Sequence, residues 1–323
     1  MSTGRTDGKL HPHALHVGSL LRPRELVEKR IAFNNGQCTA EELRKLEDET
    51  LPGIVKLQKD AGLGVITDGE IHRDVYTYGI FEGLDGITVI PKRSIYEFMI
   101  ISTMGVKEWP SVYCNGKIRH TKPIYAQEFL SLKQHVAPEE VPKLKVTICS
   151  PIWHHLNHGS EFTYDRSVYQ NDGEYFADLV QAFREEIHEL YELGCRYVQF
   201  DDPGFSFFCS SAMIGVMEAI GVDHAKLLST YIDVYNAITA KRPADLVFAV
   251  HTCRGNMKGM HFAEGGYDRI AQKLFSDLDV EVFYLESMEE IKARVACAVE
   301  IVAEGERKRP MDVALKQLSV LVL

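Results

Sequence analysis

One pattern recurs along this chain: an amphipathic helix, a glycine, a short apolar segment and then a polar side chain. Its clearest copy covers residues 174–202. Apolar residues three and four positions apart predict one buried helical face there, and they are Phe176, Leu179, Val180, Phe183, Ile187 and Leu190. Gly194 is expected to end the helix, because glycine adopts the left-handed conformation of helix C-termini at little cost. Strands that alternate with helices predict a parallel sheet.

Seven short apolar segments are predicted to be the strands of this sheet. They are residues 13–17, 63–67, 145–149, 196–200, 246–250, 281–285 and 318–323. Polar residues follow most of these segments directly, whereas a doubly wound sheet would gather its polar groups at one switch point, often behind a glycine-rich loop. Barrel enzymes build their sites at the carboxyl ends of the strands. The pattern therefore favours an α/β fold of the (β/α)8 TIM-barrel type that is one strand short.

Residues 78–130 interrupt the rhythm of helices and strands. The segments GITVIPKRSIYEFMIIST and SVYCNGKIRHTKPI predict a small inserted β-hairpin, with a turn at Asn115-Gly116. No low-complexity tract or linker divides the chain. The prediction is therefore one barrel domain over residues 1–323.

Composition and charge limit the partners and the compartment. The net charge is −10 without a long basic cluster, so nucleic acid is not an expected partner. The seven cysteines are scattered without a CxxC pair, which is typical of reduced thiols and of a cytoplasmic protein. The N-terminal segment lacks the apolar core of a signal peptide. No apolar run approaches the ~18 residues of a membrane helix, so no membrane partner is expected.

The stretch VHTCRGN places His251 and Cys253 directly after an apolar run. Side chains two residues apart on an extended segment point the same way, and zinc prefers nitrogen and sulfur ligands. The pair alone is a weak signal, and a buried histidine beside an inert thiol is the commoner case. Glu286 ends the apolar run VFYLE and could supply a third ligand, although a carboxylate there could also cap a helix. Zinc in this place would serve to lower the pKa of a bound thiol.

Five motifs, in this order, resemble the catalytic barrel of cobalamin-independent methionine synthase and its single-barrel relatives: HVGSLLRP, ITDGEIHRD, VQFDDPG, HTCRGN and FYLE. They span residues 16–286. The resemblance implies a zinc-dependent transfer of a methyl group from a folate-type donor, methyltetrahydropteroylglutamate, to a small-molecule thiol. Homocysteine is the usual acceptor, and methionine is then the product. The residues that match the zinc ligands of the family are His251, Cys253 and Glu286.

The resemblance also implies how the substrate amino acid is held. Gly18 and Ser19 match the residues that grip its carboxylate, whereas Glu70 and Asp201 match carboxylates that hold its ammonium group. Acidic side chains beside a metal suit a cationic amine, because opposite charges stabilise each other. The alternatives are a plain turn for the first pair and a helix cap or loop salt bridge for the second.

The C-terminal part of the chain departs from the family pattern. Relatives carry a fourth zinc ligand, a cysteine, just after the last strand, where this chain reads LKQLSVLVL. The helical segment SMEEIKARVACAVEIVAEG follows Glu286 at once. The barrel is therefore expected to lack strand seven and the segment after the last strand. Glu286 has a second interpretation, as the glutamate that precedes the last helix in relatives.

Two alternatives to methionine formation remain open from the sequence. One is a related zinc-dependent alkyl transfer to another thiol, such as coenzyme M, and the other is a catalytically impaired, truncated barrel. The histidine-rich stretch IWHHLNH is interpreted as pocket lining or surface histidines rather than a second metal site; its histidines are His154, His155 and His158.

Overall fold

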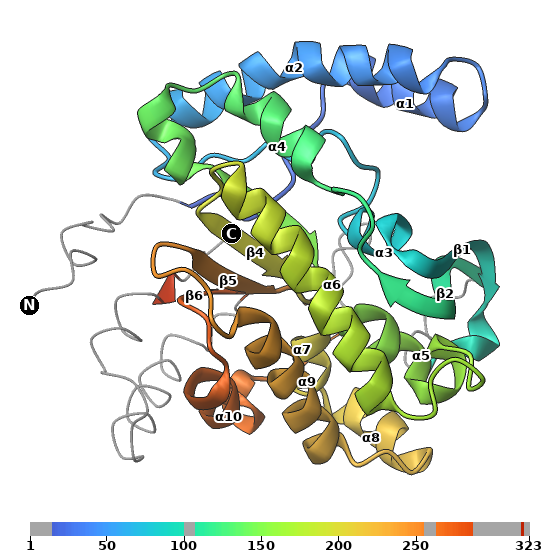
Figure 1. The fold of residues 1–323 in the computed structure, drawn as a ribbon. Coiled ribbons are helices and arrows are strands. Elements are labelled where there is room, and N and C mark those ends of the chain that lie inside the picture. Colours follow the sequence, from blue (N-terminus) through green and yellow to red (C-terminus); the bar gives the residue numbers. More distant parts are fainter. Residues whose placement is uncertain (1–14, 100–106, 255–262, 287–317, 320–323) are drawn as a thin grey trace, which may run out of the picture.

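A parallel sheet forms the centre of the computed structural model, which describes residues 15–99, 107–254, 263–286 and 318–319 (Figure 1). Within these residues the sheet has five strands in the order β3-β4-β5-β6-β7. They are β3 (Lys145–Cys149), β4 (Tyr197–Asp201), β5 (Val247–Thr252), β6 (Val282–Leu285) and β7 (Leu318–Ser319). Every neighbouring pair is parallel. Sheet order equals chain order, as in the wall of a (β/α) barrel, which confirms the expected fold class.

Helices connect successive strands and cover the outside of the sheet. Helix α6 (Asp172–Glu192) joins β3 to β4, α9 (His224–Thr239) joins β4 to β5, and α10 (Ala271–Asp277) joins β5 to β6. Figure 1 shows α6 and α9 side by side. The expected apolar face of α6 is buried, apart from the half-buried Val180, and Gly194 follows the helix with φ +109°. The repeated sequence pattern is therefore the crossover unit of the sheet.

The remaining elements surround this sheet. The α-helices are α1 (Arg24–Asn34), α2 (Ala40–Asp60), α3 (Ile80–Gly83), α4 (Ala126–Lys133), α5 (Trp153–Thr163), α7 (Gly204–Phe207) and α8 (Ser211–Ala219), and the 3-10 helices are η1 (Ile95–Glu97), η2 (Pro138–Lys143) and η3 (Tyr267–Arg269). In the described part of the chain, every helix is too short or too polar to cross a membrane.

Two of the expected strands do not form as hydrogen-bonded strands. Residues 15–17 carry no strand, and residues 63–67 contribute only a bridge between Ile66 and Leu144. Their side chains nevertheless take strand-like places. Leu15, Val17 and Val65 pack in one cluster with alternate residues of the sheet, namely Tyr197, Val247, Ala249, Val282 and Tyr284. Both segments therefore line the inner face of the sheet, although the described residues 15–17 and 63–67 do not form the predicted strands; residues 13–14 lie outside the described residues.

The last described strand lies at the far edge of the sheet, beside β6. β6 pairs with β7, through Phe283 with Leu318 and Tyr284 with Ser319. β7 belongs to the segment predicted as the last strand, so that segment occupies the place beside β6. The rest of that predicted strand, residues 320–323, lies outside the described residues, as does the predicted helix after Glu286.

The inserted hairpin is present, but its predicted turn is wrong. β1 (Asp85–Ser94) and β2 (Glu108–Arg119) pair antiparallel. Asn115 and Gly116 lie inside β2, where Asp85 pairs with Arg119 and Ile87 with Cys114. Four residues of β2 thus face Gly86 alone, which makes a bulge. Gly86 has φ +84°, and a Cβ there would lie 2.4 Å from the Lys117 carbonyl oxygen.

The histidines of IWHHLNH are not on the surface, because all three are buried. His158 shares a hydrogen bond of 2.6 Å between its Nε2 and Ser111 Oγ. His155 does the same through Nδ1 with the Tyr231 hydroxyl at 2.9 Å. These contacts join α5 to β2 and to α9. Burial lowers the pKa of His154 and His158 far enough to keep both neutral at neutral pH. In the described part of the chain, none of the three belongs to a converging group of metal ligands.

Glu186, in the middle of α6, is fully buried and should be essential for stability. It accepts hydrogen bonds from the backbone N–H groups of Ile124 and Tyr125, at 2.9 and 2.8 Å, and pairs with His120 at 2.7 Å. We expect Glu186→Leu to lower the free energy of unfolding by about 3–5 kcal/mol, because it leaves these buried donors without an acceptor. Urea unfolding would measure the loss. The same change at the exposed Glu192 of this helix should cost less than about 0.5 kcal/mol, and equal losses would contradict the assignment.

Candidate functional site

The inner face of the sheet carries polar side chains as well as an apolar cluster, whereas its outer face is mainly apolar. Side chains alternate along each strand. One set faces the covering helices, and the other faces inward, where Leu15, Val17 and Val65 pack against it. The polar residues of the inward set are Lys145, Thr147, Gln199, Asp201 and His251. Cys253 and Glu286 continue the same alternation just beyond β5 and β6. The candidate site therefore lies at the carboxyl ends of the strands, where barrels place their sites.

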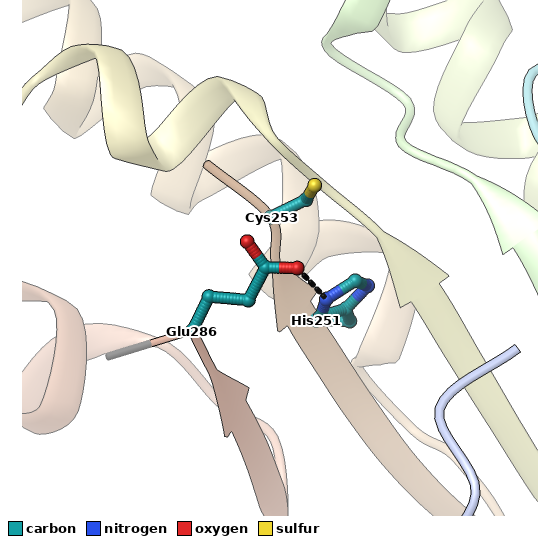
Figure 2. Close-up of side chains that lie close together, drawn as sticks. All are labelled: His251, Cys253 and Glu286. Atoms are coloured by element: carbon teal, nitrogen blue, oxygen red, sulfur yellow. Dashed lines mark ion pairs between the residues drawn. The ribbon is translucent and has the colours of Figure 1, made fainter. Parts of the chain in front are cut away.

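The three predicted metal ligands come together at the ends of β5 and β6 (Figure 2). One ligand atom each of His251, Cys253 and Glu286 lies within 4.8 Å of the others. His251 Nε2 is 3.6 Å from Glu286 Oε1. The other oxygen, Oε2, accepts a hydrogen bond of 2.7 Å from the backbone N–H of Arg254. This bond ties the Glu286 carboxylate to the loop that follows Cys253.

The donor set suits a metal ion. It combines an imidazole nitrogen, a sulfur and a carboxylate oxygen, which are the three ligand types of protein zinc sites. Bond lengths of about 2.0–2.3 Å in a tetrahedron imply ligand atoms roughly 3.3–3.8 Å apart. The observed spread of up to 4.8 Å then closes by about an ångström of side-chain movement. Three protein ligands plus one open position is the arrangement of catalytic zinc sites.

The charges around His251 are those of a site that attracts a cation. Its Nδ1 lies 3.3 Å from Asp201 Oδ1, opposite the contact to Glu286. Burial disfavours the charged ring, but Asp201 and Glu286 outweigh burial and raise the pKa of His251 to about 9. Burial likewise opposes ionisation of Glu286, yet His251 and the Arg254 N–H hold the pKa of that carboxyl below its usual value. A metal ion at Nε2 would replace the proton that this ring otherwise holds.

Two further groups of His and acidic residues converge among the described residues. They are Asp68, His72 and Glu128, and His120, Glu186 and Glu189. In the first group, Arg73 approaches Glu128 at 3.7 Å and adds a positive charge. In the second, Glu186 already accepts from two backbone N–H groups. Both groups are therefore explained as internal ion pairs.

The four predicted substrate residues also lie together. Ser19 Oγ donates a hydrogen bond of 3.0 Å to Glu70 Oε2, and Thr147 Oγ1 donates one of 3.1 Å to Glu70 Oε1. A Cβ on Gly18 would lie 2.5 Å from Glu70 Oε1 and 4.0 Å from Asp201 Oδ2. The absence of a side chain at Gly18 thus leaves room beside two buried carboxylates. Asp201 connects this group to the metal ligands, because it also contacts His251.

A tight turn after Thr67 fixes the Glu70 side chain. Glu70 has φ +55°, in the left-handed region, and its N–H donates to Asp68 Oδ1 at 2.9 Å. Arg22 donates to the carbonyl oxygens of Glu70 and Arg73, at 2.9 and 2.7 Å. Burial raises the pKa of Glu70, and the charges of Asp201 and Asp68 raise it further against the opposing effect of Arg73. A buried pair of carboxylates in this state favours a cationic ligand.

Sequence reasoning missed two residues that support the site, Lys145 and Gln199. Lys145 is 1% exposed, and its Nζ donates to Gln199 Oε1 at 2.6 Å. Burial lowers the pKa of Lys145 to about 7, against the opposing charges of Asp201 and Glu70. The sequence does contain a signal for them, because KVTIC and YVQFD carry polar residues at every second position. This alternation places Lys145 and Gln199 on the same face of the sheet as Asp201.

Three aromatic side chains pack together at the start of α5. Trp153, at the start of α5, packs against Tyr76 and Phe207, with ring centroids 5.9 and 6.4 Å apart. Burial raises the pKa of Tyr76, and the nearby charges of Cys149 and Cys253 raise it further. Tyr76, Trp153 and Phe207 therefore form one aromatic group at the start of α5.

A parallel barrel wall with metal-ligand chemistry and buried carboxylates at its carboxyl end is typical of barrel enzymes. Comparison with known proteins narrows this class. The uncharacterized protein YxjH of Bacillus subtilis (strain 168) is 36% identical over 272 residues, which are 84% of this chain and 69% of that protein. The methionine synthase of Sulfolobus acidocaldarius is 27% identical over 187 residues, which are 58% of this chain and 50% of that enzyme.

A solved structure extends the similarity over nearly the whole chain. It is the "Putative Vitamin-B12 Independent Methionine Synthase" from Listeria monocytogenes, with a TM-score of 0.68 and 29% identity over 95% of this chain and 89% of that one. No protein-family model matches the chain. The chain belongs to the family of B12-independent methionine synthases, as one of its single-barrel members. This relationship confirms the resemblance and indicates an enzyme of the methyltransferase type.

Proposed function

We propose that the protein is a zinc-dependent methyltransferase that moves a methyl group from a folate-type donor to a thiol, most favourably homocysteine, to give methionine. The observation that carries the proposal is the convergence of His251, Cys253 and Glu286 within 4.8 Å. This group lies next to the buried carboxylates of Asp201 and Glu70. A thiol amino acid has one group for each half of such a site: a sulfur for the metal and an ammonium for the carboxylates.

Zinc would be held by His251, Cys253 and Glu286. When bound, zinc supplies one chemical effect, the lowering of the pKa of a thiol so that the nucleophilic thiolate is present at neutral pH. Asp201 orients the His251 ring through Nδ1, which leaves Nε2 for the metal. Such an outer contact fixes the ring tautomer and increases the basicity of the ligand nitrogen.

The amino-acid part of the substrate would lie between Gly18 and the two carboxylates. Glu70 and Asp201 accept hydrogen bonds from the substrate ammonium, and these are charge-assisted and hence strong. The Ser19 hydroxyl and the backbone at Gly18 face the substrate carboxylate. The space that a Cβ on Gly18 would fill is the space where the ammonium approaches Glu70.

The reaction is a displacement at the methyl carbon. The thiolate sulfur forms a bond to that carbon while the bond from carbon to the donor nitrogen breaks, and the nitrogen takes up a proton in place of the methyl group. The thiol proton is released, so charge and atoms balance. Trp153 and Tyr76 pack edge to face, and their rings are the aromatic surfaces on which the flat pterin ring of the donor would stack.

The test combines metal analysis with an assay. Protein purified without chelator is analysed for zinc, and methionine formation from homocysteine and methyltetrahydropteroylglutamate is followed. We expect about one zinc ion per chain and methionine formation that stops on chelation. Coenzyme M is offered as a competing thiol, and a preference for it would favour alkyl transfer to another acceptor. A folded chain with neither zinc nor methyl transfer would contradict the proposal and indicate an impaired barrel.

Gly18→Ala should weaken substrate binding without loss of zinc. The new methyl group would lie 2.5 Å from Glu70 Oε1, so it displaces the carboxylate that Ser19 and Thr147 hold in place. We expect kcat/KM for homocysteine to fall at least about tenfold, which corresponds to about 1.4 kcal/mol. Gly53→Ala is the matched control, because nothing lies within 4 Å of its added Cβ. Equal activity of the two variants would remove Gly18 from the substrate site.

A further inference from the structure

We propose that Lys145 is the positioning residue that makes the site selective for an amino acid. It fixes the relative positions of the two sides of the site that would bind the substrate ammonium. This inference rests on the proposed function and deepens it. Lys145 begins β3 and contacts two separate parts of the site: the chain before Gly18 on one side and Asp201, through Gln199, on the other.

The Lys145 ammonium has all three of its donors occupied. Nζ donates to the carbonyl oxygens of His16 and Val17, at 2.5 and 3.1 Å, and to Gln199 Oε1 at 2.6 Å. It also lies 4.6 Å from the centre of the Tyr284 ring. Burying a charged lysine is costly unless every donor is satisfied. A buried leucine or methionine would fill this space without that free-energy cost, so the lysine points to a role beyond packing.

Lys145 sets the direction of the Gln199 amide. A lysine ammonium has donors only, so the oxygen of the amide must face it and the NH2 group must face away. The amide then donates from Nε2 to Asp201 Oδ1 at 2.6 Å. With the amide reversed, two donor groups would meet at Nζ and Asp201 would lose the hydrogen bond from Gln199. Lys145 therefore orients Asp201 through Gln199.

Lys145 also fixes the segment that leads into Gly18 and Ser19. The carbonyl oxygens of His16 and Val17 both point to Nζ, which sets the direction of the chain just before the turn. Ser19 then reaches Glu70 Oε2. One buried ammonium thus anchors the segment before Gly18 and, through Gln199, the Asp201 carboxylate.

The charge of Lys145 matters as well as its geometry. When Lys145 is protonated, its positive charge interacts with both Asp201 and Glu70, so it offsets part of their repulsion without cancelling both negative charges. The remaining negative charge is available to a substrate cation. A site with the same carboxylates but no Lys145 would hold them less precisely and would distinguish an amino acid from a plain thiol acid less well.

The experiment compares two thiols that differ only in the amino group, homocysteine and γ-mercaptobutyrate. Their binding to zinc-loaded protein is measured by calorimetry, and kcat and KM are measured with a methyltetrahydropteroylglutamate donor. We expect wild-type protein to prefer homocysteine, and Lys145→Met to lower that preference at least about tenfold with unchanged zinc content. Gln199→Leu should lower the preference in the same direction, because it cuts the same connection to Asp201.

Lys133→Met is the matched control. Lys133 Nζ donates to the Leu193 carbonyl oxygen at 2.7 Å, away from the site, so its loss should affect stability but not the preference. Undiminished preference in folded Lys145→Met overturns the inference and leaves the proposed function standing. If Lys145→Met does not fold, undiminished preference in Gln199→Leu overturns it equally. Wild-type protein that binds neither thiol, or does not distinguish them, overturns the proposed amino-acid substrate itself.

Discussion

Replacing Cys253 by alanine should remove zinc from the protein and abolish methyl transfer. The thiolate is the softest ligand of the group, and only His251 and Glu286 would remain. Because catalytic zinc sites use three protein ligands, we expect zinc affinity to fall at least about 100-fold. We expect kcat/KM to fall about 1000-fold or more, because without zinc the pKa of the substrate thiol is no longer lowered. Zinc per chain after dialysis and methionine formation would measure the two losses.

The control for Cys253 is another cysteine of the same chain. Cys195 is fully buried before β4, and its Sγ donates to the Tyr197 carbonyl oxygen. Cys195→Ala should cost about 1–2 kcal/mol of stability through the lost buried group and leave zinc content unchanged. If Cys253→Ala retained both zinc and activity, the thiol of Cys253 would be an inert neighbour of His251, which is the commoner case for a lone HxC pair.

The position of the metal group could be predicted from the sequence because it depends on two simple regularities. His251 and Cys253 are two residues apart, so they face the same side of an extended chain. Glu286 ends the next strand, and neighbouring parallel strands in chain order bring their carboxyl ends together. Neither step needs knowledge of how the sheet curves. The role of these residues as zinc ligands stays a prediction.

The supporting residues could not be predicted in the same way. The path from Lys145 through Gln199 to Asp201 crosses from β3 to β4, so it depends on which side chains meet inside the sheet. Lys145 in a short strand is equally typical of a solvent-exposed edge. Its burial follows from the packing of residues 15–17 across the inner face, which lie more than a hundred residues away in the chain.

Local signals failed where distant pairing decided the structure. Asn115-Gly116 is a strong signal for a hairpin turn, yet these residues lie inside β2. The long pairing of β1 with β2 accommodates them as a bulge opposite Gly86. The Asn-Gly pair therefore distorts the strand locally and does not reverse the chain. The same holds for residues 63–67, where apolar residues predicted a strand but the structure forms only a bridge at Ile66.

The two halves of the site should be separable by mutation, which Glu70→Gln tests. Glu70 contacts Ser19 and Thr147 but none of the three metal ligands in the described structure. The amide keeps the shape of the carboxylate and loses its charge. A hydrogen bond to a charged group contributes about 1.5–3 kcal/mol, so we expect kcat/KM for homocysteine to fall about 10- to 150-fold. Zinc content and activity with γ-mercaptobutyrate should stay unchanged, in contrast to Cys253→Ala.

The pH dependence of stability gives a second measurement on the same variant. Burial raises the pKa of Glu70, so the folded chain binds a proton at this carboxyl more tightly than the unfolded chain does. The contribution of Glu70 to stability is therefore greatest at low pH and declines as pH rises above the ordinary range of a glutamate. Gln at this position cannot ionise and avoids that decline. We expect urea unfolding to show Glu70→Gln gaining stability relative to wild type as pH rises towards neutral, while its homocysteine activity is low. If Glu70→Gln instead loses stability relative to wild type as pH rises, the ionised Glu70 is stabilised by Arg73 and is not kept for a substrate cation.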